Sequence, residues 1–149
     1  MKTLEYTIGI NKPVEVVFNT MTDKSVHPLW GQAWGEGMNY EGEWKEGEHI
    51  AFFDQSQGGT KVLIEEIVVN ESIKTKHVAM VNPQAMEIEL ADEMMKKWIG
   101  SREDYFFTAD DDSTTTLKVV MVTDEAFEEM MQAWPKALQY LKEICESKI

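Results

Sequence analysis

Three residues of the sequence, His77, Glu103 and Tyr105, have side chains that could transfer a proton or orient a polar group of a ligand. His77 alternates in phase with Thr75 and Ala79, so we expect it to face the interior. Glu103 and Tyr105 alternate in the same way on a later segment. Any of the three could act as an acid or base, and the last two could orient a ligand carbonyl or hydroxyl. The alternative is structural: a hydrogen-bonded core histidine, and polar residues that pair with neighbours at a sheet margin.

No motif of a common catalytic or cofactor site is present. The sequence contains no G-x-S-x-G, H-E-x-x-H or C-x-x-C pattern and no glycine loop before a phosphate-binding lysine. The run 110–112 of three aspartates lacks the spacing and the glycine of a calcium loop, which indicates a solvated turn. His27, His49 and His77 lie on separate segments and do not have the spacing of metal ligands. We therefore expect no metal and no cofactor, and no catalytic residue can be assigned from a motif.

The last segment, from Thr123 to Lys148, is predicted to form one long amphipathic helix. Its apolar residues recur at i, i+3, i+4 and i+7, which places them on one stripe. Pro135 has no N–H and clashes with the carbonyl four residues earlier, so the helix should kink near Met131. One half of the stripe can then pack while the other leaves a space.

The earlier residues read mostly as strands. Leu4 to Ile10 alternates with period two, and Asn11 offers a cap for a short helix over Pro13 to Met21. A second short helix or an irregular segment is expected over Thr22 to Trp34. Six further strands are expected over Met38–Trp44, Glu48–Phe53, Thr60–Val69, Ser72–Val81, Ser101–Ala109 and Thr114–Val122, with a long connection over Asn82–Ile99. Short loops between neighbours indicate an antiparallel sheet, and an amphipathic helix on its apolar face gives an α+β fold.

Composition narrows the class of protein. A chain of 149 residues is expected to form one domain, 1–149, and a net charge of −13 with one arginine, Arg102, argues against nucleic acid as a partner. No apolar run approaches the roughly 18 residues that cross a bilayer, so no membrane insertion is expected. The first residues lack a secretory signal, and the single Cys145, read as a small buried hydrophobe, suits a reducing compartment. We expect the cytoplasm.

Several passages, together with the order of elements, resemble START-like (SRPBCC, birch-pollen-allergen-like) domains. They are Gly42–Gly47, Ile50–Asp54, the passage from Lys97–Gly100 to Tyr105–Phe107, and Trp134–Leu138. Within these domains the chain is most similar, over essentially its whole length, to homologues of the heat-shock protein 90 ATPase activator. The resemblance implies a helix-grip fold: a curved seven-stranded antiparallel sheet wrapped around a long C-terminal helix, with two short helices after the first strand and an internal cavity.

The resemblance also implies which side chains surround the cavity. Methionine is flexible and polarisable, which suits a cavity that accepts varied apolar shapes, although each such residue could instead simply fill the core. The predicted lining is Trp30, Trp34, Phe52, His77, Trp98, Glu103, Tyr105, Phe107, Phe127, Met130, Met131 and Trp134.

The leading prediction is a domain that binds a small apolar or amphipathic ligand, lipid-like or aromatic, without assigned catalysis. One alternative is an enzyme of the cyclase, aromatase or hydrolase type that uses the same pocket, with His77, Glu103 or Tyr105 as acid or base. The other is a protein-interaction module that acts like a co-chaperone through an acidic surface, with a chaperone or another protein as partner. A monomer or a homodimer is expected.

Overall fold

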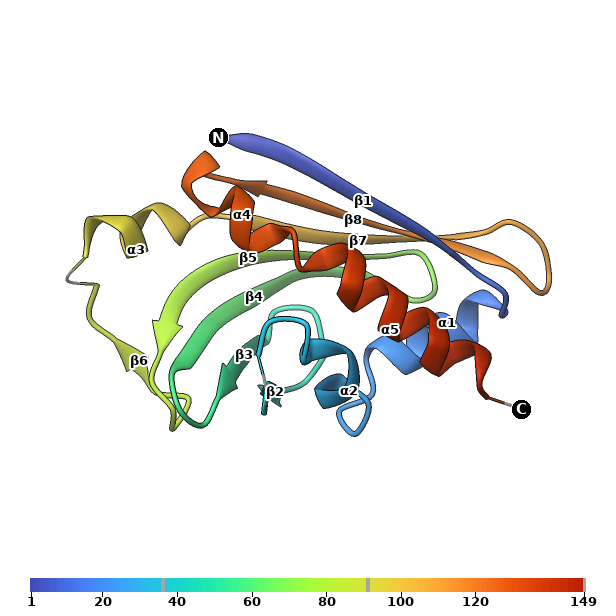
Figure 1. The fold of residues 1–149 in the computed structure, drawn as a ribbon, viewed down its shortest axis with the longest axis horizontal. Coiled ribbons are helices and arrows are strands. Elements are labelled where there is room, and N and C mark those ends of the chain that lie inside the picture. Colours follow the sequence, from blue (N-terminus) through green and yellow to red (C-terminus); the bar gives the residue numbers. More distant parts are fainter. Residues whose placement is uncertain (36, 91, 149) are drawn as a thin grey trace.

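The structure of the protein, a computed structural model, describes residues 1–35, 37–90 and 92–148. One antiparallel sheet curves around the helices on its concave side (Figure 1). Its strands lie in the order β1 (Lys2–Ile10), β8 (Thr115–Thr123), β7 (Arg102–Ala109), β5 (Ser72–Val81), β4 (Gly58–Val68), β3 (His49–Asp54) and β2 (Asn39–Gly42). A short strand, β6 (Glu87–Ile88), pairs with β5 beside this path. The predicted seven-stranded antiparallel sheet is confirmed, with β6 as an additional strand.

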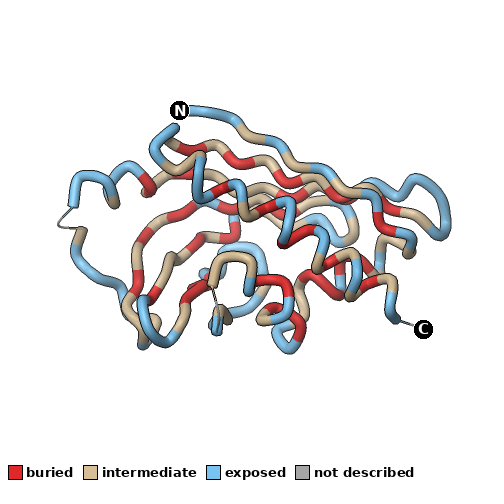
Figure 2. Tube along the Cα trace, in the orientation of Figure 1, coloured by how far each residue is buried: buried red, intermediate tan, exposed pale blue. Residues whose placement is uncertain are grey.

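The period of two in the sequence decides which side chains reach the concave face. On β8, Leu117, Val119 and Met121 are fully buried, and the residues between them are partly exposed (Figure 2). On the outer face, Lys118 Nζ lies 2.7 Å from Glu5 Oε1 of β1, so an ion pair joins these two strands. The concave face is thus apolar through the middle of β8, with the buried Thr115 and Thr123 at its two ends.

Two short helices follow β1, as the sequence predicts: α1 (Val14–Met21) and α2 (His27–Gly31). The prediction that Asn11 caps α1 is wrong, because Pro13 precedes the helix and makes no side-chain cap. The backbone N–H of Asn11 instead donates to Glu146 Oε2 at 2.9 Å, and Thr115 Oγ1 donates to the Lys12 carbonyl at 2.8 Å. These bonds tie the chain to its C-terminal helix and to β8, so α1 begins later.

The expected long connection over Asn82–Ile99 contains β6 and a helix, α3 (Glu93–Trp98); Ala91 within it, and Ile149 at the chain end, lie outside the described residues. The Asp92 side chain caps α3 by accepting from the Met94 N–H at 2.8 Å.

The strands β5 and β7 separate at one end of the sheet. They pair from Ser72 to Lys76, after which β5 turns away and its last residues pair with β6. At the point of separation the His77 N–H donates to the Ser101 carbonyl and the Gly100 N–H donates to the His77 carbonyl, both at 2.8 Å. The Trp98 ring of α3 lies there, 4.5 Å from the His77 ring between centroids. The wedge between the strands is therefore occupied by α3.

The long C-terminal helix is confirmed, but it begins at Trp134 and does not form one kinked helix from Thr123. Three segments take its place: a 3₁₀ turn η1 (Glu125–Phe127), α4 (Glu128–Met131) and α5 (Trp134–Glu146). The break lies at residues 132–133, because Pro135 has no N–H to donate to the Met131 carbonyl. Leu138 and Leu141 of α5 are buried in one core cluster with Leu117 of β8.

Candidate functional site

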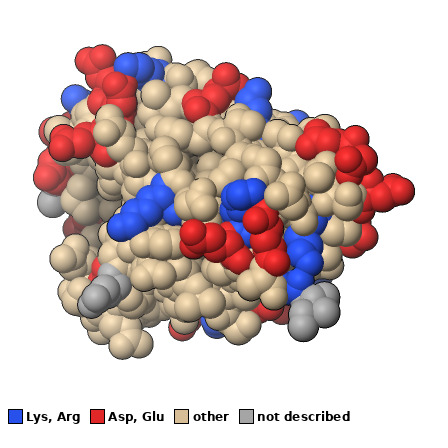
Figure 3. Space-filling view, turned by 45° about the vertical axis from the view of Figure 1, so that its right-hand side comes forward, with Lys and Arg blue, Asp and Glu red and all other residues tan. Residues whose placement is uncertain are grey.

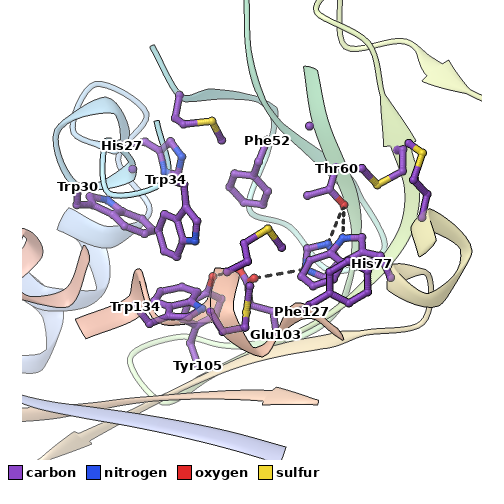
Figure 4. Close-up of a pocket in the computed structure, with 18 of the residues that line it drawn as sticks. His27, Trp30, Trp34, Phe52, Thr60, His77, Glu103, Tyr105, Phe127 and Trp134 are labelled. Atoms are coloured by element: carbon purple, nitrogen blue, oxygen red, sulfur yellow. Dashed lines mark hydrogen bonds and ion pairs between the residues drawn. The ribbon is translucent and has the colours of Figure 1, made fainter. Parts of the chain in front are cut away.

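A cavity of about 340 Å³ lies between the concave face of the sheet and the helical segments α2, α3, η1 and α4 with the start of α5. All but one of the side chains predicted to surround it do so, and Figure 4 shows the labelled ones directed into a common space. They are Trp30, Trp34, Phe52, His77, Trp98, Glu103, Tyr105, Phe127, Met130, Met131 and Trp134. These residues come from segments far apart in the sequence, and the curvature of the sheet brings them together.

Phe107 is the exception and does not line the cavity. It is buried on the same face of β7 as Tyr105, but two residues further along the strand, a displacement of roughly 6.6 Å. There α1 covers the sheet, and the Phe107 ring packs edge-on against Phe18 with 5.2 Å between centroids. Phe107 therefore belongs to the packed core.

Further residues line the cavity that the sequence reasoning missed. They are His27, Gly31, Met38, Gly59, Thr60, Met80, Met94 and Met95. Thr60 alternates in phase with the buried Val62 and Ile64, and this alternation could have identified it. Met94 and Met95 lie in the charged segment before Trp98, where no periodic pattern points inward. Their placement depends on how α3 docks.

Five side chains of the cavity wall form one hydrogen-bonded chain (Figure 4). The Trp98 indole N–H donates to Thr60 Oγ1 at 3.0 Å, and Thr60 Oγ1 lies 2.9 Å from His77 Nδ1. On the other side of the imidazole, His77 Nε2 lies 3.3 Å from Glu103 Oε1. The Tyr105 hydroxyl donates to Glu103 Oε2. Side chains from α3, β4, β5 and β7 are thereby connected along one wall.

The direction of the hydrogen bonds follows from the end groups. An indole N–H can only donate, so Thr60 accepts from Trp98 and has its own proton to give. The nearer acceptor for that proton is His77 Nδ1 at 2.9 Å, compared with the Ala79 carbonyl at 3.3 Å. His77 then carries its proton on Nε2 and donates it to Glu103.

Burial shifts two other titratable groups that line the cavity. Burial lowers the pKa of His27 from 6.5 to about 4, against the weaker opposing effect of the Glu103 charge. Burial also raises the pKa of Tyr105 well above its ordinary value, and the charge of Glu103 and the hydrogen bond to it act in the same direction. His27 and Tyr105 are therefore uncharged at neutral pH.

Some polar atoms of the lining residues are buried without a hydrogen-bond partner among the described residues: His27 Nδ1, Trp30 Nε1 and Trp134 Nε1. Such groups are exceptions in folded proteins. Within the described part of the chain, no three His, Cys, Asp or Glu side chains come together as a metal site would need. Among the helices of that same part, none is long and apolar enough to cross a bilayer.

Comparison with known proteins identifies the fold. No family model and no curated protein sequence matches the chain. Solved structures do. The Aha1 dimer from Colwellia psychrerythraea is 16% identical with a TM-score of 0.71, and the alignment covers 99% of this chain and 98% of that one. MLL2253 from Mesorhizobium loti is 12% identical with a TM-score of 0.76, over 99% and 100%. DynU16 of the dynemicin biosynthetic locus is 12% identical with a TM-score of 0.70, over 99% of this chain and 48% of that one.

These likenesses, together with the sheet order and the terminal helix, define the helix-grip class of fold. The START-like fold with an Aha1-like arrangement, which the sequence resemblance implied, is confirmed. At identities this low the likeness concerns the fold alone.

Proposed function

We propose that the chain acts as a single START-like domain, 1–149, that binds a small apolar or amphipathic ligand in the cavity between the sheet and the C-terminal helices. The observation that carries the proposal is the composition of the wall: indole, phenyl and thioether side chains around one hydrogen-bonded polar chain. Ligand sites are commonly apolar clefts of roughly 300–1,000 Å³ with a few polar groups that fix orientation. A cavity of about 340 Å³ is at the lower end of that range and suits a ligand of one to three rings.

Several features support this proposal but do not identify the ligand. The methionines of the wall are unbranched and polarisable, so they can adapt to more than one shape. DynU16, which has the same fold, comes from a biosynthetic locus. The buried Cys145 thiol has no disulfide partner, which supports the cytoplasm as the setting.

Titration with the neutral probe N-phenyl-1-naphthylamine tests the proposal. Four of the five tryptophans line the cavity, so we expect a saturable rise in probe emission at one site together with quenching of tryptophan emission. Mass spectrometry of gently purified protein searches for a ligand retained from the cell. The proposal fails if the probe does not saturate, if no apolar compound in a panel of lipids and aromatics raises the melting temperature, and if no retained molecule is found.

A matched pair of variants locates the site. Met130 lines the cavity and is 46% exposed, whereas Met86 is 64% exposed and lies outside the cavity wall. Met130→Trp should weaken probe binding by about tenfold, equivalent to 1.4 kcal/mol, because the larger ring fills part of the space. Met86→Trp should leave probe binding unchanged. Equal affinities of the two variants would place the probe elsewhere.

Acid–base catalysis in the same cavity is a second candidate function. One observation favours it: His77 lies between a hydroxyl, Thr60, and a carboxylate, Glu103, which is an arrangement that can withdraw a proton from a hydroxyl. Hydrolysis of p-nitrophenyl acetate and butyrate by the wild type and by His77→Gln tests it. If the wild type hydrolyses these esters no faster than His77→Gln does, acid–base catalysis by His77 is excluded.

A protein partner is the third candidate, either a second copy of the chain or a chaperone. The fold likeness to the dimeric Aha1 supports it. The face seen in Figure 3 carries Asp and Glu side chains interspersed with Lys or Arg side chains, and its carboxylates would attract the basic groups of a partner. Light scattering after size exclusion measures the mass of the particle, and an ATPase assay at low salt with a chaperone measures stimulation. A monomer without stimulation eliminates this candidate.

A further inference from the structure

The described part of the cavity wall contains an acidic side chain but no lysine or arginine. Among the described residues of its wall, Glu103 is the one acidic side chain, and no lysine or arginine contributes. His27 is uncharged at neutral pH because burial lowers its pKa to about 4. In the hydrogen-bonded chain described above, the two ring nitrogens of His77 face Thr60 and Glu103. The described residues of the interior therefore present one carboxyl group, and no lysine or arginine side chain, to a ligand.

The Glu103 carboxylate has accepting capacity left over. Its side chain is 13% exposed, and it interacts with the Tyr105 hydroxyl and, at 3.3 Å, with His77 Nε2. An ionised carboxylate offers about four lone-pair positions. Two of them are therefore available to a donor that enters the cavity. Because little water reaches this wall, a donor on the ligand would interact with the carboxylate more strongly than it would in bulk solvent.

Aromatic rings lie around the carboxylate. The Trp134 and Tyr105 rings are 6.0 Å apart between centroids, and the Trp98 and Phe127 rings are 5.0 Å apart. Figure 4 shows Glu103 between Trp134 on one side and Phe127 with His77 on the other. The faces of indole and phenyl rings attract cations, most strongly where water is excluded. A carboxylate among aromatic rings is a combination that suits an ammonium group.

We propose that the cavity selects apolar ligands that carry one ammonium group, with the cation at Glu103 between the aromatic rings, and that it discriminates against carboxylates of the same shape. This inference rests on the proposed function, because it specifies the class of ligand for the same cavity. A fatty acid or another anionic amphiphile would bring a second negative charge beside Glu103 with no cation to offset it. A neutral alcohol could donate one hydrogen bond but would gain nothing from the negative charge or the ring faces.

Three compounds of one shape and different charge test the selection. They are 1-naphthylmethylamine (cationic at pH 7), 1-naphthylmethanol (neutral) and 1-naphthoate (anionic), each measured by displacement of N-phenyl-1-naphthylamine from the wild-type protein. The amine should bind about tenfold or more tightly than the acid, with the alcohol between them. Equal binding of the amine and the acid, or of the amine and the alcohol, would overturn the inference.

Variants assign the selection to one carboxylate. Glu103→Gln should bring the affinities of the three compounds to within about threefold of one another. Glu89→Gln, which removes an exposed carboxylate outside the wall, should retain the preference of the wild type. A preference that persists in Glu103→Gln would also overturn the inference.

The two proposals fail in distinguishable ways. If the probe and all three compounds do not bind, the cavity is not a ligand site and the proposed function fails. If the probe binds but the compounds do not differ, only the charge selection fails. The comparison on the wild-type protein gives this answer even if Glu103→Gln does not fold.

Discussion

The indole N–H of Trp98 donates to Thr60 Oγ1 at 3.0 Å, and this bond joins α3 to β4 across the place where β5 separates from β7. It is also the first link of the polar chain that ends at Glu103. The same interaction therefore holds α3 against β4 and sets the direction of the hydrogen bonds in the cavity wall.

Removing this hydrogen bond should destabilise the protein more than a matched loss of volume. Trp98 and Trp30 are both buried and both line the cavity, but Trp30 Nε1 has no hydrogen-bond partner in the described part of the chain. Trp98→Phe should therefore lower the free energy of unfolding by about 1 kcal/mol more than Trp30→Phe, as measured by urea denaturation. Equal losses would mean that the bond to Thr60 contributes nothing net.

His27 should make the protein less stable in mild acid. In the unfolded chain an imidazole takes up a proton near pH 6.5, whereas in the fold His27 stays neutral down to about pH 4. The unfolded state therefore binds more protons between these values, so stability falls as pH falls through that window. The contribution of His27 should decrease by about 2 kcal/mol from pH 7 to pH 5.

Urea midpoints at pH 7 and pH 5 check this dependence. His27→Leu should lose less stability between the two pH values than the wild type does. His49→Gln, which changes an exposed histidine, should behave like the wild type. If His27→Leu shows the full acid dependence, other groups are responsible for it.

Gly59 should tolerate no side chain, in contrast to Gly9. A Cβ on Gly59 would overlap the Phe52 carbonyl oxygen and lie 2.8 Å from the Phe53 Cα, and both neighbours are backbone atoms of β3. Gly59→Ala should cost about 3 kcal/mol or more, or prevent folding. Gly9→Ala meets no atom within 4 Å and should be neutral or up to about 1 kcal/mol stabilising. Thermal unfolding of the two variants compares them directly, and similar melting temperatures would contradict the close approach of β3 and β4.

Substitutions of Phe107 and Phe127 should affect stability and ligand binding differently. Phe107 is 5% exposed in the packed core, so Phe107→Ala should cost about 3–5 kcal/mol of stability. Phe127 is partly buried and lines the cavity, so Phe127→Ala should cost less stability and weaken binding of N-phenyl-1-naphthylamine severalfold. Denaturation and probe titration of both variants measure the two quantities. A larger stability loss for Phe127→Ala would show that its ring acts as core.

Much of the fold and the direction of many site side chains followed from local patterns. Alternation placed His77 and Tyr105 on the buried face, and the apolar spacing after Trp134 gave the terminal helix. What alternation could not give is the distance between side chains on different strands. Thr60 meets His77 because the register of β4 against β5 shifts between Lys61 and Val62, and this irregularity has no clear signal in the sequence.

The remaining differences also come from tertiary contacts. The stripe from Thr123 predicted one kinked helix because its spacing continues through Pro135, yet the missing N–H ends the first helical segment before Trp134. Phe107 has the same alternation as Tyr105, and only the position of α1 separates the core from the cavity. Neither the pattern nor the residue type contains that information.

The early separation of β5 from β7 makes one part of the chain independent of the rest. The strands β7, β8 and β1 pair with one another along their length, and the described strand of the segment over residues 82–99, β6, pairs with β5 instead. Insertions or deletions there would alter the depth of the compartment and the reach of α3 without moving the other strands. A protein with this topology can acquire a new ligand during evolution through a change in the length of the segment over residues 82–99.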